Sequence, residues 1–213
     1  MKSNKVVGAI AVVVIIAAAL LFWRQSAGPR VNLQPSSAVG EVVVDELSRL
    51  LNGPGKVLII TRQIPGDGPN AAREQVASLT AALEHHASLK LAATEWMPRL
   101  SAGMMDMGAI TPEQLQEALQ KHPDANAAVV VAGLPAFSQP LMGQLAARSL
   151  KLASISGLSS NLRRWLEAKA LAFAVVPRAS DTPDAASSPK TARDWFQREF
   201  EIVTPETVGQ VGR

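Results

Sequence analysis

Five polar residues are the candidates for binding chemistry in this sequence. They follow apolar runs or stand near the start of an amphipathic segment, and they are Arg62, Asp67, Arg73, Ser156 and Arg178. Guanidinium groups donate several hydrogen bonds in a fixed geometry, and carboxylates and hydroxyls accept them, so these residue types can hold a hydroxylated or anionic solute. Their chemistry therefore indicates ligand binding rather than catalysis.

Arg73 is the strongest of these candidates, because it lies at the expected start of a helix. Backbone N–H groups and the helix dipole at such a place help to bind a carboxylate or a hydroxyl. An ion pair with Glu74 or Glu41 is the alternative role for Arg73. For Arg62 and Arg178, which follow strands, the alternative is simple solvation at the surface.

No motif in the sequence predicts catalysis or a bound nucleotide. Segment 66–68 (Gly-Asp-Gly) is too short for a dinucleotide-binding loop, which needs a third Gly and a later acidic residue. The serines at 156–160 lie outside any G-x-S-x-G pattern and have no nearby His. We therefore expect no catalytic residue, no enzyme activity and no cofactor.

Metal-binding residue types are scarce as well. His85 and His86 are adjacent at a helix end, where they point in different directions, so we expect them to cap helix carbonyls rather than to bind a metal. Segment 104–107 contains three Met, which could bind Cu(I), but without Cys or a nearby His the better interpretation is core filling. The chain has no Cys, which excludes disulfides and thiolate sites. No metal site is predicted.

The charge distribution argues against nucleic acid as a partner. Of the 21 Lys and Arg residues, Lys2, Lys5 and Arg24 precede residue 25, which leaves 18 basic residues against 18 acidic ones. Binding to nucleic acid normally requires a basic face, and Arg163 and Arg164 are the one adjacent basic pair in the folded part. The net positive charge of the chain therefore comes from the N-terminal residues.

The N-terminal residues predict a membrane anchor. Val6–Trp23 is an uncharged run of 18 residues, close to the ~20 that a helix needs to cross a bilayer. A cleaved signal peptide or a buried helix is the alternative, but no clean small-x-small cleavage site follows. We expect residues 1–24 to anchor the chain in the inner (cytoplasmic) membrane, N-terminus inside and domain in the periplasm, with 25–38 as a flexible tether.

The elements that position the candidate residues alternate between apolar strands and amphipathic helices. Lys56–Thr61 is an almost continuous apolar run, typical of a strand buried on both faces. Pro69 and Asn70 open a helix, and Leu89–Trp96 is the next strand. Segment 55–96 therefore predicts a strand, a crossover helix and a parallel strand.

The same alternation continues along the chain. Helices are expected at 39–51, 111–122, 139–148, 159–168 and 191–200, and further strands at 127–132, 150–155, 170–176 and, at the sheet edge, 202–203. Such alternation predicts a three-layer α/β/α domain over 39–208 with a tail at 209–213. Its sheet is Rossmann-like, mostly parallel and five- to six-stranded, with flavodoxin-like strand order.

Three local patterns carry a family resemblance. Gly55-Lys56 precedes a strand that leads through a Gly-containing loop to Ala71-Ala72-Arg73, His122-Pro123-Asp124 precedes another strand, and Phe200–Val208 forms the ending. In these patterns and their order the chain resembles the type 1 periplasmic binding proteins, specifically the C-terminal lobe of the sugar-binding, ribose-binding-like branch. The resemblance implies a fold in which sugar binds between two lobes.

The chain departs from that family at the ligand contacts. It has one lobe, and the family's Asn-Asp, Phe-Asp and Gln positions fall at 132–135, near 155–157 and near Val175. Of the usual polar contacts Arg73 alone is retained. A bound sugar needs several fixed donors and acceptors, because each unpaired buried polar group costs ~1–3 kcal/mol.

Two functions follow from these departures. The first is a non-catalytic extracytoplasmic module that presents its strand ends to a protein partner or to a second copy of itself. The alternative is a binding protein for a sugar-like solute in a transport or sensing system, with its site completed by a second chain.

Overall fold

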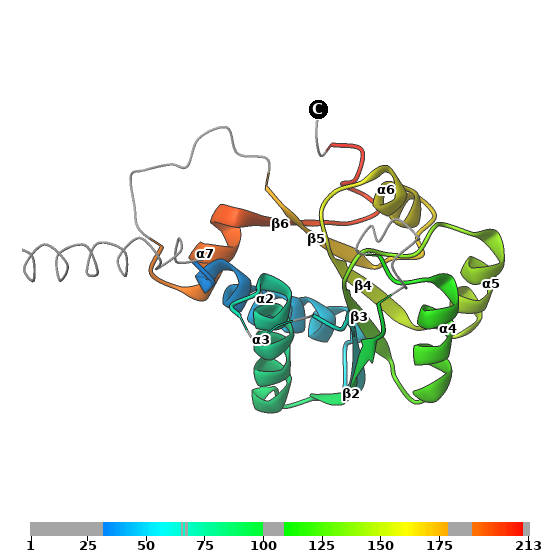
Figure 1. Cartoon of the computed structure of the whole chain (residues 1–213), viewed down its shortest axis with the longest axis horizontal. Coiled ribbons are helices and arrows are strands. Elements are labelled where there is room, and N and C mark those ends of the chain that lie inside the picture. The colour runs from blue at the N-terminus through cyan, green and yellow to red at the C-terminus, as the bar shows by residue number, and fades with distance from the viewer. Residues whose placement is uncertain (1–31, 65, 67, 100–108, 179–188, 211–213) are drawn as a thin grey trace, which may run out of the picture. The chain divides into compact units, whose positions relative to one another are not determined.

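The apolar run after Gly55 forms β1 (Gly55–Arg62), which has strands on both sides (Figure 1). The computed structural model describes residues 32–64, 66, 68–99, 109–178 and 189–210. From Leu33 onward these residues belong to one compact unit. The predicted anchor, Val6–Trp23, lies outside the described residues. Within the described ranges, no helix combines the length and the hydropathy needed to cross a membrane.

The sheet has six strands in the order β2-β1-β3-β4-β5-β6. Besides β1 they are β2 (Leu89–Met97), β3 (Ala127–Val131), β4 (Lys151–Ile155), β5 (Phe173–Pro177) and β6 (Phe200–Val203). Each neighbouring pair is parallel except β5 and β6, which run antiparallel. The predicted mostly parallel sheet with flavodoxin-like order is confirmed, and so is the predicted strand at its edge.

Six described helices accompany the strands. They are α2 (Gln34–Leu51), α3 (Ala71–His85), α4 (Pro112–Lys121), α5 (Gln139–Ala147), α6 (Ser160–Glu167) and α7 (Ala192–Glu199). Their starts follow local capping rules. Asn70 caps α3 through the N–H groups of Ala72 and Arg73, and Thr111 forms a capping box with Gln114 at the start of α4.

The helices cover both faces of the sheet, which gives the predicted three layers (Figure 1). Val57 and Ile59 of β1 pack on one side in a core with α2, α3 and α7, whereas Leu58 and Ile60 pack on the other side with α4, α5 and α6. All four side chains are fully buried, because a central parallel strand is covered on both faces.

The first described helix differs from the sequence prediction. α2 begins at Gln34 rather than at Val39, so residues 34–38 of the predicted tether are helical. Pro35 stands in the first turn of α2. An N–H group at that place has no partner within the helix, so proline, which lacks one, loses no hydrogen bond, and its fixed φ angle suits a helix. Ser36 and Ala38 are buried in the domain. Composition alone indicated a tether here, but tertiary packing extends the helix.

A β-bulge divides β2 into two halves. Leu91 lies opposite Val57 and Ala93 opposite Leu58, so Ala92 is the extra residue. Leu89 and Leu91 belong to the core with α3, whereas Ala93 and Met97 belong to the core with α4. The bulge therefore exchanges the two faces of the strand, and it turns Trp96 toward α3.

The α2–α3 contact is close at one point. The amide of Gly40 donates a hydrogen bond of 3.1 Å to the hydroxyl of Ser78, and the backbone of Ser78 and Leu79 fills the space that a side chain at residue 40 would need. Glycine lets the two helix backbones approach here.

Candidate functional site

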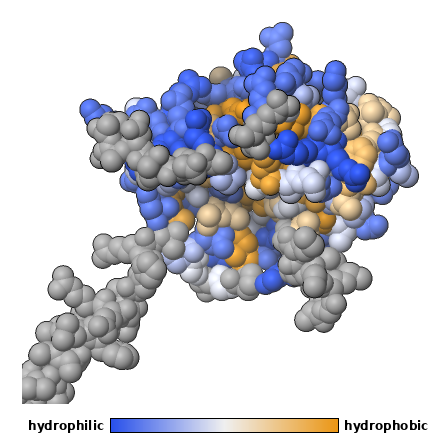
Figure 2. Space-filling view, turned by 90° about the horizontal axis from the view of Figure 1, so that it is seen from above, coloured by the Kyte–Doolittle hydropathy of each residue, from blue (hydrophilic) through white to orange (hydrophobic). Residues whose placement is uncertain are grey.

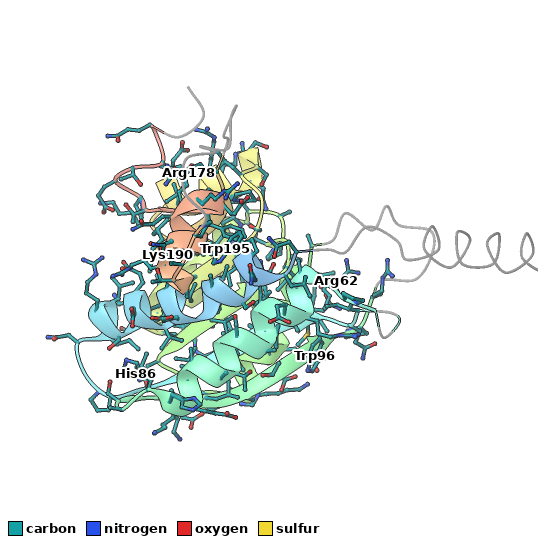
Figure 3. All side chains as sticks on the ribbon, turned by 90° about the vertical axis from the view of Figure 1, so that its left-hand side faces the viewer. Arg62, His86, Trp96, Arg178, Lys190 and Trp195 are labelled. Carbon is teal, nitrogen blue, oxygen red and sulfur yellow. The ribbon has the colours of Figure 1, made fainter. Side chains whose placement is uncertain are left out.

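The candidate site is the edge of the sheet formed by the carboxyl ends of the parallel strands. Ligands of open α/β sheets bind at this edge, because the loops that follow the strands gather there. Figure 3 shows Arg62 and Trp96 on one side of the domain and His86 on the other. α2 and α3 both begin on the side of Arg62.

The predicted ligand residues are spread along this edge. Arg62 ends β1, Ser156 follows β4 and Arg178 follows β5, and β3 lies between β1 and β4. With strands ~4.8 Å apart, Ser156 lies two strand spacings and Arg178 three spacings from Arg62. Asp67 lies outside the described residues. Arg62 and Arg73 therefore lie at the two ends of the loop between β1 and α3. Ser156 and Arg178 lie at another part of the edge.

Arg73 holds the loop between β1 and α3. Its Nη2 atom donates to the carbonyl oxygens of Gly66 at 2.7 Å and Ile64 at 3.3 Å. The predicted alternative, an ion pair with Glu74 or Glu41, is not among the ion pairs of the described residues. The guanidinium is therefore used in part to fix the backbone of the loop, and contact with a ligand stays a prediction.

Arg62 and Arg178 differ in their exposure. Arg62 is 9% exposed, so little of its side chain is open to a solute. Arg178 is exposed, and its backbone N–H donates to the carbonyl of Glu199 at 2.8 Å. An exposed arginine of this kind is well solvated, which is the alternative that the sequence suggested for it.

Ser156 lies beside a second serine. Its hydroxyl is 3.2 Å from that of Ser154, which is fully buried in β4, and its N–H donates to the carbonyl of Val175. Ser156 itself is half-buried. The Ser156 hydroxyl therefore already makes one hydrogen bond within the chain, to the Ser154 hydroxyl.

The loop after β3 is fixed by two residues of α6 that the sequence analysis did not single out. Asn161 accepts from the N–H of Phe137 at 3.0 Å and donates to the carbonyls of Leu134 at 3.2 Å and Pro135 at 2.9 Å. The indole N–H of Trp165 donates to the same Pro135 carbonyl at 3.0 Å. The one local signal for Asn161 was its place two residues after Ser159, the expected start of the helix. That signal does not identify its partners, because they lie more than twenty residues away in the sequence.

This loop occupies the place where the family resemblance implied an Asn-Asp pair. Leu134 and Pro135 are buried, and the Phe137 ring packs edge-on against Trp165 with a centroid distance of 6.2 Å. Gly133 pairs with Ala109, and a side chain at residue 133 would lie 2.9 Å from the Ala109 Cα atom. The loop is therefore apolar, and Asn161 satisfies its polar backbone groups.

A surface hollow lies at the carboxyl ends of β1 and β2. It has a volume of about 690 Å³ and is lined by Gln63, Ile64, Arg73, Trp96, Pro98 and Arg99. Trp96 is 40% exposed, which is high for a large hydrophobic side chain. The sequence analysis placed Trp96 in a strand but did not predict its exposure, because the exposed face depends on the bulge.

The histidines lie away from this edge. His85 is 2.8 Å from the carbonyl oxygen of Ala81, as the predicted capping role requires. His86 is the C-cap residue of α3, and its backbone N–H donates to the carbonyl of Leu83 at 3.3 Å, while its Nδ1 atom accepts from the N–H groups of Ser88 and Leu89 at the start of β2. In the part of the chain that the structure describes, no three His, Asp or Glu side chains gather as metal ligands.

Two of the patterns that carry the family resemblance, Gly55-Lys56 and His122-Pro123-Asp124, lie at the opposite edge of the sheet. Lys56 Nζ is 2.6 Å from Asp124 Oδ2. The backbone N–H of Lys56 donates to the Asn126 side-chain oxygen, and the backbone N–H of Asn126 donates to the Lys56 carbonyl. His122 Nε2 is 2.8 Å from Glu95 Oε1, and this hydrogen bond is the main reason why the pKa of Glu95 lies below its ordinary value. These residues join strands and helices, so the resemblance concerns the scaffold more than the site.

The hydrophobic surface of the domain is divided. On the face shown in Figure 2, hydrophobic areas are separated by hydrophilic side chains rather than joined in one continuous patch. The part of that face formed by described residues therefore shows no single large apolar patch.

No protein-family model matches the chain, and no curated protein is significantly similar to it. Solved structures are similar in fold. The arabinose-binding protein AraP from Geobacillus stearothermophilus aligns over 84% of this chain and 63% of its own, with 14% identity and a TM-score of 0.57.

Two further solved structures are sugar-related proteins of transporters. A sugar-binding protein from Bacillus halodurans shares 14% identity over 83% of this chain and 64% of its own, with a TM-score of 0.54. A solute-binding protein from Burkholderia graminis in complex with D-arabinose shares 16% identity over 84% and 62%, with a TM-score of 0.53.

The chain spans less than two thirds of the length of these proteins. At 12–16% identity the similarity concerns the fold. A single six-stranded sheet with helices on both faces agrees with part of a two-lobed protein. The chain therefore has the type 1 periplasmic binding protein fold over about three fifths of the length of those relatives.

Proposed function

We propose that this protein is a non-catalytic interaction module, anchored in the inner membrane by residues 6–23, with its folded domain in the periplasm. The domain presents the carboxyl-terminal edge of its sheet to another protein. In a two-lobed binding protein this edge faces the second lobe. Here another chain takes that place.

The observation that carries this proposal is the use of polar groups at the edge. Asn161 makes three hydrogen bonds to the loop after β3, and Arg73 binds two carbonyls of the loop after β1. Leu134 and Pro135 replace polar residues at the family's ligand position. Among the described residues of the edge a free sugar would find few fixed donors and acceptors, whereas a protein surface can be matched by shape and apolar contact.

The proposed anchor keeps the domain near the membrane. Ten residues, 24–33, separate the end of the predicted span from the start of α2. A fully extended chain covers at most ~3.6 Å per residue, so these residues reach about 35 Å. A partner in the same membrane, or bound to it, lies within that range.

Site-specific photo-crosslinking in intact cells tests the proposal. A photoreactive amino acid replaces Ser156 or Arg178 at the proposed edge, and Asp124 or Lys151 at the opposite edge serves as the matched control. We expect one protein adduct of defined mass from the first two positions and none from the controls. Equal labelling at both edges, or none at either, would contradict an edge-specific protein interface.

A second candidate is binding of a sugar-like solute, with the site completed by a second chain. It is supported by the fold of solved sugar-binding proteins, one of them in complex with D-arabinose, and by the position of Arg62, Ser156 and Arg178 at strand ends. Thermal melting of the full chain in detergent with D-arabinose, D-allose and a wider sugar panel separates the two candidates. We expect no shift in melting temperature. A sugar-dependent rise that disappears in Arg178→Ala would favour the solute.

A further inference from the structure

We infer that the groove between α2 and α3 binds a basic helix of a partner protein, one that carries two Lys or Arg residues four positions apart. This surface is separate from the carboxyl-terminal edge of the sheet, so the inference goes beyond the function proposed above. It is based on the shape of the groove, on the small residues of its floor and on its three carboxylates.

The groove lies on the outer side of the two helices. Figure 3 looks onto this face, where α2 and α3 lie side by side and both begin on the side of Arg62. The groove has a volume of about 660 Å³, and all of its lining residues belong to α2, to α3 or to the C-cap of α3. Along α3 it extends from Glu74 to His85, which is ~16 Å or about three helical turns.

Short side chains form the floor of the groove. Ala77 and Ala81 stand one turn apart on α3, and both are exposed. Val44 lines the groove from α2, and its side chain is buried. Packed helices fit ridges of side chains into grooves at interaxial distances of ~8–10 Å, and short side chains allow the closer approach. The floor therefore suits a third helix that lies along the groove.

The charged side chains at the groove are acidic. Glu41 and Asp45 line it from α2, and Glu74 lines it from α3. Among the described residues that line the groove there is no Lys or Arg. None of the three carboxylates forms an ion pair with another residue of the described ranges. Charge complementarity therefore selects a basic partner.

The positions of the carboxylates determine the spacing of the basic residues. Glu41 and Asp45 are four residues apart, so they lie on the same side of α2, about 6 Å apart along its axis. Two basic residues four positions apart on a partner helix have the same spacing. A second copy of this groove is a poor occupant, because its own carboxylates would repel those of the first.

Photo-crosslinking of a peptide to the full chain in detergent micelles tests this inference. A photoreactive amino acid replaces Ala81, which is exposed on the floor of the groove. The probe is an alanine-based peptide of about fourteen residues, stapled on its outer face to keep it helical, with two Lys four positions apart. The control peptide has the same composition, but its two Lys are two positions apart and so lie on different sides of the helix. We expect the control to give at least about threefold less crosslink.

An exchange of charges between chain and peptide gives the second readout. Glu41→Lys combined with Asp45→Lys reverses two exposed charges of the groove, whereas Glu84→Lys makes the same change at an exposed α3 position outside its lining. We expect the double variant to lower the crosslink yield of the Lys peptide about tenfold, and Glu84→Lys to change it by less than about twofold. A peptide with Glu in place of both Lys should regain the yield on the double variant. Thermal melting shows that the variants are folded.

The same photoreactive residue in intact cells identifies the partner segment. We expect an adduct whose crosslinked segment, mapped by mass spectrometry, carries two basic residues four positions apart, and the double variant should lose this adduct. Equal yields for the two peptides, an adduct with an acidic segment, no adduct, or a link to residues 1–31 of the same chain overturns the inference. Crosslinks at Ser156 and Arg178 test the proposed function separately, so either surface can fail while the other stands.

Discussion

At the residue scale, Asn161 decides the form of the candidate edge. Its amide is the polar group that joins α6 to the loop after β3, through one accepted and two donated hydrogen bonds. The side chain is partly buried, so the loss of a bond leaves a backbone group without a good replacement.

We predict that Asn161→Asp destabilises the domain by about 1–3 kcal/mol. Aspartate has the same shape and still accepts from the Phe137 N–H, but it cannot donate to the Leu134 and Pro135 carbonyls and brings a negative charge close to them. The measurement is urea unfolding of the full chain in detergent, followed by near-ultraviolet circular dichroism. Ser160→Ala, at an exposed neighbouring position, is the control. Equal stability of the two variants would show that the bonds are not needed.

At the element scale, the packing of α2 on α3 shows how a single position sets the distance between two helices. Gly40 is buried in α2 beside Ala38 and Val39, and its amide donates a hydrogen bond to the Ser78 hydroxyl. α2 also carries much of the core on its face of the sheet, including Val43 and Leu47.

We predict that Gly40→Ala destabilises the domain by about 1–3 kcal/mol, because overpacking of a close contact forces the two helix backbones apart. The new methyl group would overlap the backbone of Ser78 and lie 2.6 Å from the Leu79 nitrogen. Gly53→Ala is the matched control, since the nearest atom to its methyl group would be the Leu51 carbonyl oxygen at 3.9 Å. Thermal melting of both variants checks the difference, and a similar melting temperature for both would refute it.

At the scale of the whole molecule, the protein combines a predicted anchor with a domain whose fold matches about three fifths of a sugar-binding protein. In the proposed function, the anchor decides where the domain acts, and the sheet edge decides which partner it meets. These two properties are tested separately.

We predict that the full chain stays in the membrane fraction after a carbonate wash and keeps residues 1–24. The expected reason is the length and hydropathy of Val6–Trp23, which is about as long as the hydrocarbon core requires. Cell fractionation and intact-mass measurement check this, and deletion of residues 1–24 should release the domain to the soluble fraction. A mature chain that begins between residues 25 and 28 would show that the segment is a cleaved signal peptide.

The sequence by itself determined the order and type of the elements. Buried strands such as β1 and β3 are continuous apolar runs, and the starts of α3 and α4 carry their own capping residues, so their signals are local. The alternation of these elements was enough to predict a three-layer domain with a mostly parallel sheet.

Tertiary structure decided the features that depend on contacts between distant residues. The start of α2 at Gln34 depends on burial against the domain, the exposure of Trp96 on a bulge opposite β1, and the role of Arg73 on carbonyls of a loop. Asn161 reaches partners more than twenty residues away. None of these is visible in local spacing, because register and side-chain partners are set only when the sheet and helices pack together.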